Sequence, residues 1–207
     1  LFVTDNNGCV NSDNLDVIVT PLPPVYAGPD QSICIGITTP LLATGAVSYV
    51  WSPSTALTNT NIDNPRANPT STITYVVTGT DAIGCVNIDS MVVTVNPLPP
   101  TAMTALPDLC VDADDLPLGP YGSPAGGTYS GTGVTANTFS PSTAGVGTYS
   151  IVYTYTNPVT TCTQSTNGPI IVRPLPAPAF VASPSVSTLA NAAIHFVDQS
   201  PDAVDWN

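Results

Sequence analysis

The five cysteines are the residues whose spacing most clearly indicates chemistry. Cys9, Cys85 and Cys162 follow one another with a period of about 76 residues, as expected for a tandem repeat of one structural unit. Cys34 and Cys110 form a second series with the same period. Two independent series with a common period make the repeat a firm prediction. Each complete repeat then contains one cysteine of each series.

Paired cysteines in a small, strand-rich extracellular unit are more often a disulfide than a metal site or a catalytic thiol. We therefore expect the disulfides Cys34–Cys85 and Cys110–Cys162, each closing a loop of about 50 residues and stabilising its unit by roughly 4 kcal/mol. The repeat places the expected partner of Cys9 upstream of residue 1. Disulfides in turn predict an oxidising compartment, at the cell surface or outside the cell.

Carboxylates are the other candidate ligands, because the chain has 14 acidic residues, all of them Asp. The run DADD at 112–115 begins like a calcium loop, but Pro117 stands at the sixth position, where an EF-hand needs glycine. A β-sandwich would bring the segments that carry Asp30 and Asp81 to the same pole. We expect ordinary turn residues there, with a calcium ion held by Asp30 and Asp81 as the second interpretation.

Catalytic equipment is not evident in the sequence. His195 is the only histidine, and its neighbours AAI and FVD are typical of a strand rather than of a general base. Glycoside hydrolysis needs two carboxyl groups, and in a chain without Glu nothing singles out a pair of Asp. Phosphate-binding glycine loops and spaced His/Cys zinc ligands are also missing. We expect no enzymatic activity and no obligatory cofactor.

The charge balance excludes two classes of partner. The formal net charge is −12, and Arg66 and Arg173 are the only cations besides the N-terminus. Nucleic-acid binding needs Lys and Arg to displace phosphate counterions, and anionic lipid attracts basic segments. No apolar run approaches the roughly 18 residues of a membrane span. We expect neither nucleic-acid binding nor direct membrane insertion.

The elements that must position these residues are strands. Glu and Lys, which favour helices, are absent, whereas Val, Ile, Thr and Tyr, which favour strands, recur. Residues 70–81 and 84–96 predict a hairpin about the turn DAIG. We expect 31–36 to form an edge strand and 39–46 to pair with 48–54. The inward face of the hairpin follows from its period of two: Tyr75, Val77, Met91, Val93 and Val95.

About seven short strands per repeat is the number found in an immunoglobulin-like sandwich. Trp51 and Tyr75 are the expected core aromatics of the first complete repeat. In the next repeat, Tyr149, Tyr153 and Tyr155 lie on one side of a strand. They suit either a sugar-stacking platform or, by the preferred interpretation, the core.

Several stretches resemble a known family. YAGPDQSICIG (26–36), STITYVVTGTDAIGC (71–85) and DSMVVTVNPLPP (89–100) look like the tandem immunoglobulin-like and PKD-like repeats of very large surface proteins of Bacteroidota. GGTYSGTGV (126–134) is similar to a second repeat type in such proteins. The resemblance implies type IX secretion and a role as an adhesin or gliding-associated protein. The pattern DSM also matches the O-glycosylation pattern of that phylum, at Ser90.

The predicted fold class is all-β, with tandem immunoglobulin-like β-sandwich domains in an elongated array and truncated domains at both ends. Proline fixes φ and removes a hydrogen-bond donor, so proline-rich joints between domains are expected to be stiff. The predicted divisions are the last strands of a truncated repeat (1–20), a joint (21–24), an immunoglobulin-like domain (25–96), a joint (97–100), an immunoglobulin-like domain of a second subtype (101–173), a joint (174–178) and the start of a truncated PKD-like domain (179–207).

Three functions are consistent with this organisation. The leading hypothesis is a non-catalytic structural or adhesive segment of a large secreted cell-surface protein, acting as a stiff, disulfide-stabilised stalk or filament. Its partners would be neighbouring repeats, and surface glycans or other cells. The second hypothesis is a carbohydrate-binding accessory module of an exported polysaccharide-degrading enzyme, which predicts exposed aromatic residues. The third is a subunit of a strand-complemented extracellular fibre.

Overall fold

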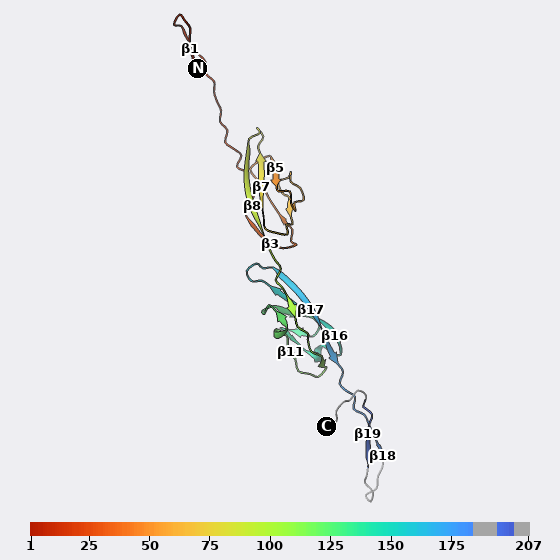
Figure 1. Ribbon diagram of the computed structural model, residues 1–207. Helices are drawn as coiled ribbons and strands as arrows, with labels where there is room; N and C mark the ends of the chain where they lie inside the picture. Colours follow the sequence, from red (N-terminus) through yellow and green to blue (C-terminus); the bar gives the residue numbers. More distant parts are fainter. Residues whose placement is uncertain (184–193, 201–207) are drawn as a thin grey trace. The chain divides into compact units, whose positions relative to one another are not determined.

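The computed structural model describes residues 1–183 and 194–200, which are almost entirely strands and loops (Figure 1). In this part of the chain, helix is limited to two short segments, η1 (Gly119–Tyr121) and α1 (Pro141–Ala144). The chain divides into two compact units, residues 1–97 and 98–207. The all-β prediction is therefore confirmed, and each unit is described by itself.

Unit 1 contains a four-stranded sheet in the order β3-β8-β7-β5. Strand β3 runs parallel to β8, and the other two pairings are antiparallel. The facing layer consists of the short strands β4 and β6, extended by the bridges Tyr26–Thr44 and Leu57–Ala67. The bounds are β3 (Gln31–Cys34), β4 (Thr39–Pro40), β5 (Ser48–Ser52), β6 (Arg66–Ala67), β7 (Ile73–Thr80) and β8 (Val86–Asn96).

Of the two strand pairings predicted for unit 1, one is confirmed and the other is wrong. The hairpin about DAIG is confirmed, with β7 antiparallel to β8 from Ile73–Val93 to Thr80–Val86. The predicted pairing of 39–46 with 48–54 is wrong, because β4 pairs with β6 and β5 pairs with β7. The chain crosses from one layer of the sandwich to the other between these two segments. They therefore face each other through side chains and not through backbone hydrogen bonds.

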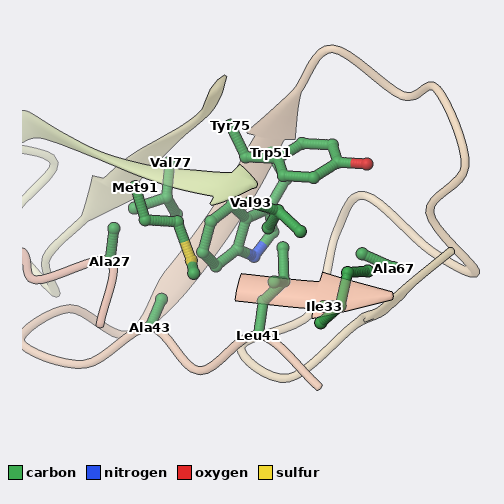
Figure 2. Close-up of a cluster of buried hydrophobic side chains, with 10 residues drawn as sticks. All are labelled: Ala27, Ile33, Leu41, Ala43, Trp51, Ala67, Tyr75, Val77, Met91 and Val93. Carbon is green, nitrogen blue, oxygen red and sulfur yellow. The ribbon is translucent and has the colours of Figure 1, made fainter. Parts of the chain in front are cut away.

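The core of unit 1 lies between its two layers. Figure 2 shows Trp51 and Tyr75, from the four-stranded sheet, among aliphatic side chains of both layers. The indole nitrogen of Trp51 donates a hydrogen bond to the carbonyl of Ile62 at 3.0 Å, and the hydroxyl of Tyr75 donates to the carbonyl of Thr55 at 2.8 Å. Both predicted core aromatics are thus confirmed, each with its polar atom bonded. The other buried members are Ala27, Ile33, Leu41, Ala43, Ala67, Val77, Met91 and Val93.

Unit 2 repeats the same arrangement. Its four-stranded sheet has the order β10-β17-β16-β13, again with one parallel pair, β10 with β17. Two smaller sheets, β11-β15-β14 and β12-β9, provide further strands. The bounds are β9 (Ala102–Met103), β10 (Leu109–Cys110), β11 (Leu116–Pro117), β12 (Gly122–Ser123), β13 (Thr128–Ser130), β14 (Val134–Thr135), β15 (Thr138–Phe139), β16 (Gly147–Thr156) and β17 (Thr163–Arg173).

The tyrosines of β16 belong to the core of unit 2. Tyr153 is buried, and its ring centroid lies 4.8 Å from that of Tyr129 on β13. Tyr149 and Tyr155 are partly buried and pack against the same cluster. The interpretation that these tyrosines belong to the core, rather than to a sugar-stacking platform, is therefore confirmed. Hydrophobic residues that complete the buried cluster are Leu118, Phe139, Ile151, Ile170 and Val172.

Two hairpins lie toward the chain ends, β1 (Phe2–Thr4) with β2 (Val10–Ser12) and β18 (Phe180–Ser183) with β19 (His195–Asp198). His195 is an exposed strand residue opposite Ser183, as predicted. The remainder of the predicted PKD-like segment, residues 184–193 and 201–207, lies outside the described residues.

The burial of Tyr75 and Tyr129 predicts how the free energy of unfolding changes at alkaline pH. Burial raises the pKa of Tyr75, and burial followed by the neighbouring Tyr153 raises the pKa of Tyr129. The ordinary tyrosine pKa is about 10. The two protonated tyrosines therefore make their full contribution to the free energy of unfolding below pH ~10. This contribution is lost as the pH rises above that value, because the unfolded chain releases these protons more readily than the folded chain. We expect absorbance at 295 nm to show Tyr75 and Tyr129 ionising only as near-ultraviolet circular dichroism is lost. Full ionisation of all eight tyrosines with the dichroism unchanged would contradict this.

Candidate cross-linking sites at the ends of the units

Residues 23–34 run along the whole length of β8, the last strand of unit 1. The side-chain amide of Asn87, near the start of β8, donates to the carbonyl of Pro23 at 2.9 Å. At the far end of β8, Cys34 lies opposite Asn96 in the parallel register. The end that holds Pro23, where the preceding joint arrives, is called the incoming end. The end that holds Cys34 and Asn96, where the next joint leaves, is called the outgoing end.

Cys34 and Cys85 lie at opposite ends of unit 1. Cys85 directly precedes β8, at the incoming end, whereas Cys34 is at the outgoing end. Strand β8 has 11 residues, and at about 3.3 Å per residue it separates the two cysteines by roughly 36 Å. A disulfide needs Cα atoms roughly 4.4–6.8 Å apart. The predicted Cys34–Cys85 disulfide is therefore wrong, and Cys85 is a free thiol.

The same geometry overturns the prediction for unit 2. Cys110 lies opposite Arg173 at the outgoing end, and Cys162 directly precedes the 11-residue strand β17. The predicted Cys110–Cys162 disulfide is therefore also wrong, and Cys110 is an exposed free thiol. Arg173 forms an ion pair with Asp108 at this end, but both side chains are too exposed for the pair to add much stability.

The sulfur chemistry of the chain is thus divided between bonded and free cysteines. Cys34 and Cys162 are disulfide-bonded. Cys85 and Cys110 are free, as is the exposed Cys9. The repeat period identified the cysteine series correctly, but it gave no information on the end of the unit at which each cysteine lies. The signal that was missed is that one series directly precedes the last strand of the sheet, while the other ends the strand that pairs with it in parallel, β3 or β10.

Asp81 organises the turn that precedes Cys85. One oxygen of its carboxylate accepts hydrogen bonds from the backbone N–H groups of Ile83 at 3.0 Å and Cys85 at 2.8 Å. Asp5, one repeat period earlier in the sequence, makes the equivalent bonds in the β1–β2 turn. At the equivalent position of unit 2 the acceptor is the neutral Asn157. The position therefore needs a hydrogen-bond acceptor and not a negative charge.

The predicted calcium pair is not brought together. The carboxylate of Asp30 accepts a hydrogen bond from the backbone N–H of Val92 at 2.8 Å, while Asp81 follows Thr80, which pairs with Val86. Val86 and Val92 are six residues apart on β8, which corresponds to roughly 20 Å along the strand. The placement of Asp30 and Asp81 at one pole is therefore wrong. Residues 1–183 and 194–200 contain no group of three His, Cys, Asp or Glu side chains arranged to hold a metal ion.

Ser90, the predicted glycosylation site, lies on the exposed face of β8 opposite Val76. Its neighbour Asp89 faces the other way and accepts a hydrogen bond from the backbone N–H of Ala27 at 2.8 Å. The aspartate of the DSM pattern thus has a structural role in this unit. Glycosylation of Ser90 stays a prediction.

The strand order defines a class of protein, tandem immunoglobulin-like β-sandwiches. No protein-family model matches the chain, and a comparison with curated proteins finds no match either. Similar solved structures include the insect immune protein hemolin, at 16% identity and a TM-score of 0.35, over 79% of this chain and 49% of hemolin. A Ca²⁺-stabilised ice-binding adhesin of an Antarctic bacterium is 13% identical with a TM-score of 0.43, over 87% of this chain and 57% of the adhesin. Mouse cadherin-23 EC22–24 is 12% identical with a TM-score of 0.33, over 86% of this chain and 78% of that one.

The chain spans about half the length of the first of these proteins and somewhat more of the second. At such identities the similarity concerns the fold alone. Within the part of the chain that the structure describes, no helix has both the length and the apolar character needed to cross a bilayer.

Proposed function

We propose that this chain is a non-catalytic structural segment of a large secreted cell-surface protein, in which repeated sandwiches form a stiff stalk that supports an adhesive region. The observation that carries the proposal is the lengthwise passage of the chain through unit 1. The chain arrives beside Asn87 and leaves at Asn96, at opposite ends of β8. Each unit therefore extends the chain by nearly the full length of its last strand, roughly 36 Å for 11 residues.

The joints suit the same function. The joint after unit 1 contains Pro97, Pro99 and Pro100 in four residues. Each proline fixes its own φ and restricts the preceding residue to extended conformations, so such a segment resists bending. A stalk needs long units and stiff joints, and the length of β8 and the three prolines of the joint support this proposal. Type IX secretion, attachment to the surface of a Bacteroidota cell and binding to glycans or other cells belong to the same proposal, and they rest on the resemblance of the repeats.

The carbohydrate-module hypothesis has less support. Sugar recognition of this kind needs exposed aromatic faces, and Trp51, Tyr75 and Tyr153 are buried with their polar atoms bonded inside their own units. These aromatic side chains are fully used in packing.

One observation favours a fibre subunit as the second candidate. Leu15 and Val17 correspond by the repeat to Met91 and Val93 of β8, which are core residues. In their own segment, residues 1–20, Leu15 and Val17 are 87% and 77% exposed. This segment therefore has the apolar face of a last strand without a sandwich covering it, and a strand-complemented fibre would cover it with another molecule.

Small-angle X-ray scattering of the full chain in reducing buffer tests the stalk. A compact protein of 207 residues would have a radius of gyration of about 17 Å. Two strands of 11 residues joined end to end give a rod of about 90 Å, with a radius of gyration of about 26 Å or more. A radius of gyration as small as that of the compact protein would overturn the stalk. A molecular mass that rises with concentration would favour the fibre.

A control variant separates joint stiffness from unit length. Replacing the exposed Pro97 and Pro100 with Gly, while the buried Pro99 is kept, leaves the packing of both units intact and gives the joint more backbone freedom. We expect a smaller mean radius of gyration and a broader distance distribution for this variant.

An antibody raised against residues 25–173 tests where the protein is located. A surface-exposed polypeptide much longer than this chain supports the proposal, and a soluble fragment of enzyme size contradicts it.

A further inference from the structure

We propose that unit 1 carries tension through a clamp between its entry segment, defined as residues 23–34, and its last strand β8. The two segments lie side by side and run in the same direction along the whole unit. The clamp consists of side-chain hydrogen bonds that connect them where a backbone ladder does not. Carrying tension is a task of the stalk, so this role rests on the proposed function, whereas the clamp itself is tested independently.

Backbone pairing between the entry segment and β8 is confined to the outgoing end of the unit. Strand β3 pairs with the last four residues of β8, and the N–H of Ile35 adds a bond of 2.9 Å to the carbonyl of Asn96. The side-chain amide of Asn96 also donates to the hydroxyl of Ser32 at 2.7 Å and to the carbonyl of Ile33 at 3.2 Å. Residues 23–30, all of them described, form no ladder with β8. Another kind of connection must therefore hold this part of the entry segment.

Side chains provide that connection. Three of them each form a hydrogen bond of 2.8–2.9 Å with a backbone group of the other segment: Asn87 donates to the carbonyl of Pro23, Asp89 accepts from the N–H of Ala27, and Asp30 accepts from the N–H of Val92. The bonded residues are 62 to 64 positions apart in the sequence, as are the paired residues Gln31 and Val93 of the ladder. The side-chain bonds therefore continue the parallel register from the ladder to the incoming end.

The two carboxylates are expected to form the strongest of these bonds. A hydrogen bond to an ionised acceptor is roughly twice as strong as one between neutral groups. The bond of Asp89 is also partly buried, where water competes less with it. Asp89 lies on β8 and Asp30 on the entry segment, so each segment binds a backbone N–H of the other. The two carboxylates thus hold the segments together from both sides.

Tension on the chain pulls the two segments in opposite directions. The joint at 21–24 pulls the entry segment toward the incoming end, and the joint after Asn96 pulls β8 toward the outgoing end. The segments must then slide past each other along roughly 36 Å of contact for the 11 residues of β8. The bonds between them lie across the direction of sliding. They therefore resist the tension together and do not open one after another from one end.

The residues of the clamp differ between the repeats. Residues 1–20 keep Asn11 and Asp13 one period before Asn87 and Asp89. In unit 2, other residues occupy the three β8 positions of the clamp: Gln164 for Asn87, Thr166 for Asp89 and Pro169 for Val92. Proline has no backbone N–H to donate to a carboxylate. Among the described residues of unit 2, the side-chain connection between the corresponding segments is the exposed pair of Arg173 with Asp108. We therefore expect unit 2 to resist tension less than unit 1.

Single-molecule pulling of the full chain by its two ends, in reducing buffer, tests the proposal. Reducing buffer opens the disulfide bonds of Cys34 and Cys162, so that noncovalent contacts alone resist the force. Each unit that unfolds releases roughly 200 Å of chain. Forced unfolding is governed by the unfolding rate, so the lifetime of each unit at constant force is the quantity to measure. We expect two unfolding events, with the longer lifetime for unit 1.

Two aspartate variants identify the clamp. Asp89→Ala and Asp30→Ala are each expected to shorten the lifetime of unit 1 about tenfold, because a charge-assisted bond across the sliding contact is lost. The lifetime of unit 2 should not change. Asp89→Asn keeps an acceptor oxygen without the charge and should give an intermediate lifetime. Because Asp30 is exposed, its variant keeps the core intact and tests the clamp even where Asp89→Ala does not fold.

Asp81→Ala is the matched control. The carboxylate of Asp81 also accepts hydrogen bonds from backbone N–H groups, those of Ile83 and Cys85, but these lie in the β7–β8 turn and do not involve the entry segment. We expect the lifetime of unit 1 under force to stay the same in this variant. A lifetime shortened as much as in Asp89→Ala would overturn the clamp, and so would wild-type lifetimes for both Asp89→Ala and Asp30→Ala.

The clamp and the stalk fail in different measurements. An extended chain in scattering, with lifetimes that the aspartate variants leave unchanged, would overturn the clamp and keep the stalk. A compact chain whose unit 1 unfolds faster under force in the Asp89→Ala and Asp30→Ala variants would support the clamp and overturn the stalk.

Discussion

Replacing Trp51 with Ala is expected to lower the free energy of unfolding of unit 1 by about 3–5 kcal/mol. Trp51 is 2% exposed and packs with Tyr75, Leu41 and other side chains from both layers of the sandwich (Figure 2). Alanine would leave a cavity there and would also remove the hydrogen-bond donor of the Ile62 carbonyl. Because small domains are stable by only about 5–15 kcal/mol, this loss is a large share of the total.

Urea unfolding followed by far-ultraviolet circular dichroism measures the effect. Val50→Ala is the matched control, since Val50 precedes Trp51 on β5, points to the opposite face and is 52% exposed. We expect a change of no more than about 0.5 kcal/mol for the control. The transition of unit 2 should be the same in both variants. Equal losses for Trp51→Ala and Val50→Ala would show that the indole is not a central packing residue.

Features of the fold that depend on neighbouring residues could be predicted from the sequence. The β7–β8 hairpin follows from alternation at period two on both sides of a turn that contains Gly84, whose φ is +89°. The burial of Tyr75 and Met91 follows from the same alternation. These two inferences need only local geometry and are confirmed. The pairing of 39–46 with 48–54 was an equally local prediction and is wrong, because the chain changes layer between these segments.

Features that depend on residues far apart in the sequence could not be predicted in the same way. The parallel pairing of β3 with β8 places Cys34 beside Asn96, and no local pattern specifies a pairing over that sequence separation. The disulfide prediction assumed that cysteines of one repeat are close in space, and this pairing places them at opposite ends. The calcium prediction failed for a related reason, because the register along β8 separates Asp30 from Asp81.

The contact between Gly45 and the first joint predicts the second large effect. Gly45 has φ +90°, and a Cβ atom there would overlap the backbone carbonyl group of Pro24. Backbone atoms cannot rotate away, so Gly45→Ala must displace the joint from unit 1. The adjacent bridge, in which the backbone groups of Tyr26 and Thr44 exchange hydrogen bonds at 3.0 and 2.9 Å, would be strained. We expect a loss of about 3 kcal/mol, from positive φ together with steric displacement.

Gly84→Ala separates the two causes of that loss. Gly84 has φ +89°, nearly the same as Gly45, but no atom lies within 4 Å of the position that its Cβ would occupy. We therefore expect this variant to lose only the roughly 1–2 kcal/mol that an L-residue loses at positive φ. Urea unfolding of both variants, followed by the change in tryptophan fluorescence as Trp51 becomes exposed, measures the difference. Because only Gly45 touches the joint, an excess loss at Gly45 means that the joint residues are packed as part of unit 1. Equal losses would mean that the joint moves aside freely, and the stiffness proposed for the stalk would then depend on the prolines alone.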